Sequence, residues 1–327
     1  MAKTRSTGPD GLIIVDKPSG FTSHDVVAKM RGIARTRRVG HAGTLDPMAT
    51  GVLVIGVEKA TRLLGHLALT EKEYVATIRL GQMTVTDDAE GEITASAGVA
   101  GSAGVTDVTG VAGGSGVGRD TIEAGVAELT GNIQQVPSKV SAIKIDGKRS
   151  YARVRQGEEF ELAARPVTVS SFVVHEVREA VADDGTAVLD VDATVVCSSG
   201  TYIRALARDL GAGLGVGGHL TALRRTRVGP YGLEAAHTLE QLQEAADSSD
   251  SSDERRLPVM PIAEAAAAAF PRWDVDEKQA RLLSNGVRLD APGLGVGGPI
   301  AVFGPEGRFL ALVEESKGKA KSLAVFA

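Results

Sequence analysis

The chain has 327 residues, of which 43% are hydrophobic and 24% are charged, and its formal net charge is −5 at pH 7. This composition is typical of a globular protein large enough for two folded units, and no apolar run approaches the length of a membrane-spanning helix. The N-terminus lacks the apolar core of a secretory signal, and the single cysteine, Cys197, excludes an internal disulfide and a multi-cysteine metal site, so we expect a cytoplasmic protein.

The first predicted elements form a strand, a turn and a helix over residues 10–35. The segment "DGLIIVDKP" is typical of a short buried strand that ends at proline, and Thr22 and Asp25 form a capping-box pattern after it. Apolar residues at helical spacing follow the cap: Val26, Val27, Met30 and Ile33.

The charge around this helix is uneven. No acidic residue lies between Asp25 and Asp46, and this stretch contains five cations: Lys29, Arg31, Arg35, Arg37 and Arg38. Nucleic-acid binding needs a basic face, and an acidic chain can carry one locally. On charge alone, a solvated helix face explains the cluster equally well.

The next segment, "GHAGTLDPMATGVL" at 40–53, contains an isolated aspartate before a proline. Pro47 disfavours the helical conformation at Asp46, so the carboxylate is predicted to project from a loop. Gly40, Gly43 and Gly51 permit tight turns around it. The alternative is that Asp46 caps a helix whose first residue is Pro47.

Strands and helices then interleave. The segments "EYVATIRLG" at 73–81 and "AVLDVDATVVC" at 187–197 alternate like half-buried strands, and "ALARDLGAGLG" at 205–215 begins as a helix and ends at glycines. The pattern predicts a mixed α+β domain over residues 9–235.

Two compositional breaks divide the chain. Residues 95–118 are almost all small and predict a surface insertion, after which a helix is expected near "RDTIEAGVAEL". The polar stretch "AADSSDSSDERR" at 245–256 predicts a linker, which we place at 236–259. The remaining residues, 260–327, contain the apolar runs "PIAVF" and "RFLALV" and predict a small β-rich module.

The chain resembles the TruB family of pseudouridine synthases over most of its length. Six blocks occur in the family's order: "DKPSGFTSHDVV" at 16–27, "GHAGTLDPMATGVLVIGVEKATRLL" at 40–64, "KEYVATIRLG" at 72–81, "QVPSKVSAIKIDGKRSYARVRQG" at 135–157, "CSSGTYIRALARDLG" at 197–211 and "HLTALRRTRVGPY" at 219–231. The resemblance implies a mixed, mainly antiparallel central sheet flanked by helices, followed by a PUA-like module at 260–327.

The resemblance also implies an activity, the isomerisation of uridine to pseudouridine at position 55 in the T-loop of tRNA. The enzyme would need no metal or organic cofactor, would contact the T-arm and elbow of tRNA, and would act as a monomer without an obligatory protein partner or a membrane. Insertion 95–118 departs from the family pattern, and we expect it to be functionally silent.

The family's catalytic aspartate matches Asp46. A carboxylate suits this reaction because it can attack C1′ or C6 as a nucleophile or remove the proton next to C1′, and the sequence leaves all three routes open. Arg204 matches the arginine that keeps this carboxylate ionised and aimed. Tyr202 contributes to the same site, and it shares a face with Arg204 only if the helix starts close to Arg204.

Other matched residues are implied to hold the RNA. Tyr74 would stack on the extruded base, His41 would fill the space that the base leaves, Lys17 would support the pocket and Leu223 would form an apolar wall. Each has a structural alternative: a core tyrosine for Tyr74 and for Tyr202, an incidental histidine, a turn lysine and a helix core leucine.

Block 135–157 resembles the family's thumb, which closes over RNA. It carries six cations against one acid, a balance that suits phosphate contact: Lys139, Lys144, Lys148, Arg149, Arg153 and Arg155. The alternatives to the tRNA enzyme are a synthase with another RNA target, such as the guide-RNA-directed branch, and a non-catalytic tRNA-binding or tRNA-folding protein. The second of these would not need Asp46 with Arg204.

Overall fold

The computed structural model describes residues 9–99, 116–138, 144–145, 148–149, 162–248 and 257–326. It divides into two compact units, residues 1–70 with 227–327 and residues 71–226. Helices and sheets occur in both units, so the predicted mixed class with a mainly antiparallel sheet is confirmed.

The first unit contains a small antiparallel sheet around β3. Strand β1 pairs along one edge of β3, from Gly11 opposite Val57 to Lys17 opposite Gly51, and β2 pairs along the other edge. Strand β14 pairs with β1, and β13 pairs with the end of β12 (Gly218–Val228). The bounds of these strands are Gly11–Lys17 (β1), Val39–Ala42 (β2), Thr50–Val57 (β3), Tyr231–Gly232 (β13) and Met260–Pro261 (β14).

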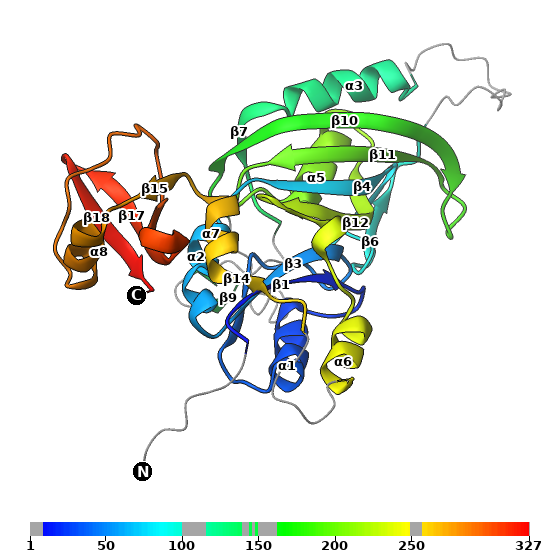
Figure 1. The fold of residues 1–327 in the computed structure, drawn as a ribbon. Coiled ribbons are helices and arrows are strands. Elements are labelled where there is room, and N and C mark those ends of the chain that lie inside the picture. Colours follow the sequence, from blue (N-terminus) through cyan, green and yellow to red (C-terminus); the bar gives the residue numbers. More distant parts are fainter. Residues whose placement is uncertain are drawn as a thin grey trace, which may run out of the picture. The chain divides into compact units, whose positions relative to one another are not determined.

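Both faces of this sheet are buried, which explains the continuous apolar run of β1. Alternate residues such as Ile13 and Val15 belong to one core with helices α1 (Ser23–Ile33) and α6 (Leu239–Asp247). Figure 1 shows these two helices side by side along the sheet. Leu12 and Ile14 face the other way. Their core also contains residues of α2 (Leu64–Leu67), α7 (Ile262–Ala269) and the C-terminal sheet.

Helix α1 begins where its cap was predicted. Thr22 Oγ1 accepts from Asp25 N at 3.1 Å, and Asp25 Oδ2 accepts from Thr22 N at 2.9 Å. The apolar residues at helical spacing are buried, as the amphipathic pattern requires: Val26, Val27, Met30 and Ile33.

The C-terminal sheet has the order β15, β16, β17, β18, with β15 and β16 parallel and the other pairs antiparallel. Its strands are Arg272–Asp274 (β15), Ile300–Phe303 (β16), Phe309–Ser316 (β17) and Lys319–Val325 (β18), and helix α8 (Glu277–Ser284) lies beside this sheet.

The predicted linker 236–259 differs in part from the structure. Residues 239–247 form α6, which buries Leu242 in the core, so this part is a packed helix. The domain boundaries themselves stay a prediction.

The second unit contains a sheet of order β12, β4, β11, β10, β7. Its strands are Lys72–Leu80 (β4), Gly131–Gln135 (β7), Arg165–Val181 (β10), Ala187–Cys197 (β11) and Gly218–Val228 (β12). Helices α3 (Arg119–Glu128) and α5 (Ile203–Gly213) pack on this sheet and on each other, as Figure 1 shows. Gly125 lies where the two helices meet, and a Cβ there would lie 2.8 Å from Leu210 Cδ1, so a larger residue would displace the Leu210 side chain.

Short elements complete the description. They are the hairpin strands Gln82–Thr84 (β5) and Ile93–Ser96 (β6), the paired strands Lys144–Ile145 (β8) and Lys148–Arg149 (β9), and 3₁₀ turns at Glu58–Arg62, Leu233–Ala235 and Pro305–Gly307. Helix α3 begins where a helix was expected after the insertion. Most of insertion 95–118 (residues 100–115) and most of the thumb (139–143, 146–147 and 150–157) lie outside the described residues.

Candidate active site

Asp46 lies in the loop between β2 and β3, as its position before Pro47 predicts. No helix follows Pro47, so the alternative in which Asp46 caps a helix is wrong. A turn forms instead, in which Ala49 N donates to Asp46 O at 3.1 Å. Asp46 is partly exposed, whereas Leu45 and Ala49 are buried. The loop therefore buries its apolar residues on either side of a partly exposed Asp46.

A buried serine of α1 holds the loop just before Asp46. Ser23 Oγ accepts from Leu45 N at 2.9 Å and donates to Leu45 O at 3.2 Å. The serine is 1% exposed, so both bonds are shielded from water. Because both polar groups of Leu45 are engaged, the main chain entering Asp46 has a defined orientation.

The turn before α1 holds the loop just after Asp46. Lys17 Nζ donates to Pro47 O at 3.0 Å, and Gly20 N donates to the same oxygen at 2.9 Å. Lys17 also donates to Phe21 O at 2.6 Å and to Pro18 O at 2.9 Å, and its side chain is fully buried. The predicted pocket-supporting lysine thus links the first strand to the Asp46 loop.

His41 lies in β2, opposite Ile55 of β3. It is half-buried, and its ring meets that of His24 edge to face, with centroids 5.6 Å apart and planes at 77°. Edge-to-face packing restrains a ring. His24, an exposed residue of α1, did not stand out in the sequence.

In the second unit, Tyr202 and Arg204 lie at the start of α5. The helix begins at Ile203, and Tyr202 before it is extended, with φ −103° and ψ 110°. This is the arrangement that the two side chains need in order to share a face. Arg204 is 4% exposed, and its Nη1 donates to Thr86 O at 2.9 Å.

An acidic pair after β5 binds the first turns of α5. Arg204 Nη1 lies 3.5 Å from Asp88 Oδ2, and both side chains are about 5% exposed. One turn later, Arg208 Nη1 donates to Asp87 Oδ2 at 3.3 Å. Burial raises the pKa of the Asp87 carboxyl, and Arg208 counteracts this. Neither Asp87 nor Asp88 stood out in the sequence. The signal that could have found them is an adjacent acidic pair together with Arg204 and Arg208, two arginines that lie one helical turn apart.

Tyr74 and Leu223 lie on neighbouring strands, β4 and β12. Both are buried, at 8% and 6% exposed. The alternative that places Leu223 in a helix core is wrong, because β12 is a strand. Lys72 shares a face of β4 with Tyr74, and burial, followed by the charge of Arg225, lowers the pKa of Lys72 to about 8.

The predicted residues thus form two sets. Lys17, His41 and Asp46 come from the first unit, where Lys17 is bonded to the Asp46 loop. The second unit carries the other set, which consists of Tyr74, Tyr202, Arg204 and Leu223.

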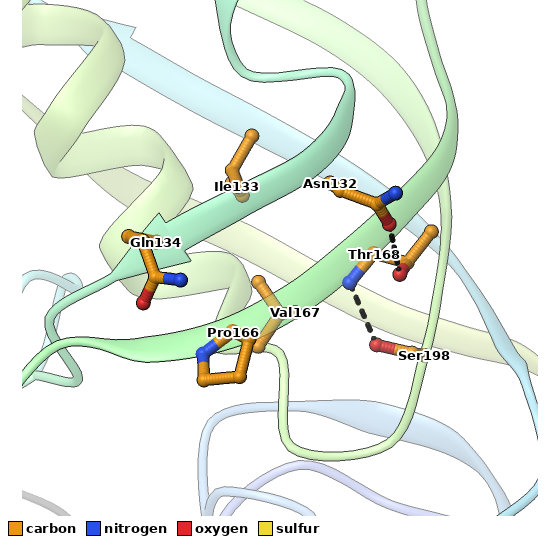
Figure 2. Close-up of a pocket in the computed structure, with 7 residues that line it drawn as sticks. All are labelled: Asn132, Ile133, Gln134, Pro166, Val167, Thr168 and Ser198. Atoms are coloured by element: carbon orange, nitrogen blue, oxygen red, sulfur yellow. Dashed lines mark hydrogen bonds between the residues drawn. The ribbon is translucent and has the colours of Figure 1, made fainter.

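A separate open hollow of about 220 Å³ lies along β7 and β10 in the second unit, and none of the predicted residues lines it. Figure 2 shows that Thr168 N donates to Ser198 Oγ and that the Thr168 hydroxyl bonds the Asn132 amide. Within the described ranges, His, Cys, Asp and Glu side chains form no group suited to a metal ion, and no helix is long and apolar enough to cross a bilayer.

Comparison with protein families gives three matches that together cover most of the chain. The family described as "TruB family pseudouridylate synthase (N terminal domain)" matches residues 31–203. Two C-terminal families follow. "tRNA pseudouridylate synthase B C-terminal domain" matches 204–266, and "tRNA Pseudouridine synthase II, C terminal" matches 270–327.

Individual proteins agree with these matches. The chain is 75% identical over 323 residues to a protein of Streptomyces griseus named "tRNA pseudouridine synthase B", with 99% of each chain covered. A protein of the same name from an Arthrobacter species is 55% identical over 325 residues, covering 97% of this chain and 96% of its own.

Chains of two solved complexes have similar folds. A chain of the "Crystal Structure of a Cbf5-Nop10-Gar1 Complex" has a TM-score of 0.70 and 28% identity, covering 97% of this chain and 84% of its own. A chain of the "Structure of H/ACA RNP bound to a substrate RNA containing 2'-deoxyuridine" has a TM-score of 0.68 and 26% identity, covering all of this chain and 92% of its own. The chain belongs to the TruB family of pseudouridylate synthases.

Proposed function

We propose that the protein isomerises uridine to pseudouridine in tRNA, at position 55 of the T-loop, as a cytoplasmic monomer without a metal or organic cofactor. The relatives named tRNA pseudouridine synthase B, which match along almost the whole chain, support the reaction and the substrate class. The structural observation that carries the proposal is the loop of Asp46, whose main chain is bonded on both sides of this partly exposed residue.

The reaction moves a bond without changing composition. The bond from C1′ to N1 breaks, the base turns, and C1′ bonds to C5. C5 then loses its proton, and N1 gains one. A carboxylate can serve this sequence as a nucleophile at C1′ or C6, or as the base that removes the proton next to C1′. Asp46 fills the catalytic role by any of the three routes.

The environment of Asp46 suits a residue that must be aimed. Ser23 orients the peptide before Asp46, and Lys17 orients the one after it, so few main-chain rotations can displace the carboxylate. Holding a reacting group in position is a large part of catalysis. Arg204 would stabilise the ionised carboxylate, since a charge-assisted hydrogen bond favours the charged form.

The remaining residues would handle the base and the RNA. A uridine inside a folded tRNA must leave its stack before it can react. Tyr74 would then stack on the extruded base, Leu223 would contact it as an apolar wall, and His41 would occupy the space left behind. Tyr202 lies two residues before Arg204 in the chain and would contact the base from that side.

Tritium release tests this function. A tRNA transcript labelled with tritium at C5 of uridine should lose label to water when it is incubated with the protein alone. A transcript with cytidine at position 55 should lose none, and a chemical adduct read by reverse transcription should place pseudouridine at position 55 alone. Release that required an added guide RNA would assign the protein to the guide-directed branch. Binding without any release would identify a non-catalytic tRNA-binding protein.

A further inference from the structure

Gln135 ends β7, and its side chain is bonded to Tyr202 rather than directed to solvent. Its Oε1 accepts from Tyr202 N at 2.8 Å, and its Nε2 donates to Tyr202 O at 3.0 Å. The residue is 1% exposed. A buried amide must satisfy both its donor and its acceptor, and Gln135 does so on a single residue. Gln135 is also the first residue of block 135–157, which resembles the family's thumb.

This contact reproduces one hydrogen-bonded pair of an antiparallel sheet. In such a pair a residue donates its N–H and offers its C=O on the same side, as an extended backbone allows. In a helix the two groups point in opposite directions along the axis. The Gln135 amide can therefore make both bonds only while Tyr202 keeps its extended conformation.

Helix α5 has no side-chain cap of its own. Its N-cap residue is Tyr202, whose side chain makes no capping bond, whereas Ser, Thr, Asp and Asn are the preferred residues at this position. Leu206 N donates to Tyr202 O at 3.1 Å, so the same carbonyl receives both the first helical bond and the amide of Gln135.

A second contact ties the chain after Gln135 to the same helix. Arg208 Nη2 donates to Val136 O at 2.7 Å, and Arg208 also bonds Asp87. The end of β7 thus contacts α5 at its cap and again in its second turn. Between these contacts lies Arg204, which is held by Thr86 and Asp88.

We propose that Gln135 is a positioning residue for the isomerisation, because its amide holds Tyr202 extended and so fixes how the side chains of Tyr202 and Arg204 are presented. The inference rests on the proposed function, since it gives Tyr202 and Arg204 a role in that reaction. It therefore predicts that a substitution of Gln135 lowers the rate of the chemical step and leaves the affinity for tRNA unchanged.

The substitution Gln135→Glu tests this through pH. The introduced carboxylate can accept from Tyr202 N, but its second oxygen faces Tyr202 O, and two acceptors repel. Protonation restores a donor at that place, and the acid then matches the amide in shape and hydrogen bonding. Burial and the facing carbonyl oxygen both raise the pKa of the introduced carboxyl above its ordinary value.

The measurement is the single-turnover rate of pseudouridine formation at saturating tRNA transcript, expressed as a ratio to the native protein. For Gln135→Glu we expect a loss of about tenfold at about pH 8.5 that largely disappears at about pH 5.5. Affinity for tRNA, measured by filter binding, should stay at the native value. A purely structural role would lower the unfolding temperature and leave the single-turnover rate at the native value across the pH range.

Gln134→Glu is the matched control, because it adds the same charge one residue earlier. Gln134 is exposed at the hollow drawn in Figure 2, and we expect native rates at every pH. If Gln135→Glu does not fold, Gln135→Met replaces it, with a loss of rate at every pH and unchanged tRNA affinity.

A native rate for the Gln135 variants across the pH range would overturn the inference, and so would a loss confined to tRNA affinity. Either result requires a native protein that forms pseudouridine. If the native protein forms none, the proposed function itself has failed, and the two failures are thereby distinguished.

Discussion

The ion pair between Arg204 and Asp88 is nearly closed to water, with both side chains about 5% exposed. Removing one member of such a pair leaves an uncompensated buried charge, which is far more costly than losing an exposed pair. Arg204 is also bonded to Thr86 O, so its guanidinium is held by two groups of one turn. The pair therefore links the stability of the unit to the orientation of an arginine that we assign to catalysis.

Asp88→Ala should destabilise the protein and slow the reaction together. We expect the free energy of unfolding to fall by about 3–5 kcal/mol, measured by urea denaturation. The single-turnover rate should fall by at least about tenfold because Arg204 loses an anchor.

Asp87→Asn is the control for this variant. Burial raises the pKa of Asp87, so the folded protein already disfavours its charge, and Arg208 keeps its bonds to Val136 and Asp209. We expect less than about a twofold change in rate. If Asp87→Asn lowered the rate and the free energy of unfolding as much as Asp88→Ala does, this would contradict the claim that Asp88 in particular anchors Arg204.

At the scale of elements, the Asp46 loop is positioned by residues that precede it in the chain. The N-terminal turn and the first residue of α1 supply the bonds, through Lys17, Ser19, Gly20 and Ser23. Ser23 is buried and bonds both polar groups of Leu45, whereas Ser19 is exposed and donates only to Met48 O, at 3.2 Å. The two serines therefore differ in how firmly they hold the loop.

Ser23→Ala should loosen the presentation of Asp46. It leaves the buried N–H and C=O of Leu45 without these partners, which should cost about 1–3 kcal/mol of unfolding free energy. We also expect a fall of about tenfold in single-turnover rate, with tRNA affinity unchanged. Ser19→Ala, in exposed surroundings, should change neither quantity appreciably. A native rate for Ser23→Ala would show that the loop does not depend on α1.

Local elements were predictable because short-range patterns determine them. The capping box of Thr22 and Asp25, the alternation in β4 and the helix predicted at 205–215 all follow from neighbouring residues, and the structure confirms them. The bonds that organise the site could not be predicted in this way. Gln135 to Tyr202 and Asp88 to Arg204 join segments far apart in the sequence, and sheet register and helix packing decide which side chains meet.

At the scale of the whole molecule, buried ionisable groups make stability depend on pH. Burial, with the charge of Arg225 second, lowers the pKa of Lys72 from 10.5 to about 8. Burial raises the pKa of Cys197, its neighbour across β4 and β11, from 9.0 to about 11. Lys72 is charged in both states below pH 8, and above it the unfolded chain retains more protons, so this residue makes stability rise with pH. Cys197 has the opposite effect, since its thiol ionises first in the unfolded chain.

Comparison with Lys72→Met isolates the lysine, because the contribution of Cys197 largely cancels in the difference. Relative to this variant, the native protein should gain about 1–2 kcal/mol of unfolding free energy between about pH 7.5 and about pH 9.5, after allowance for solvent screening. Chemical denaturation at a series of pH values measures this. A difference that does not change with pH would show that Lys72 is not held in a desolvated site.

The central claim is that the carboxylate of Asp46 performs the isomerisation, and Asp46→Asn tests it most directly. The amide keeps the size of the side chain and cannot act as a nucleophile or a base at neutral pH. With excess enzyme and a labelled tRNA transcript, we predict that Asp46→Asn releases no tritium from C5 and binds tRNA as tightly as the native protein does. Tritium release by this variant at the native rate would contradict the account.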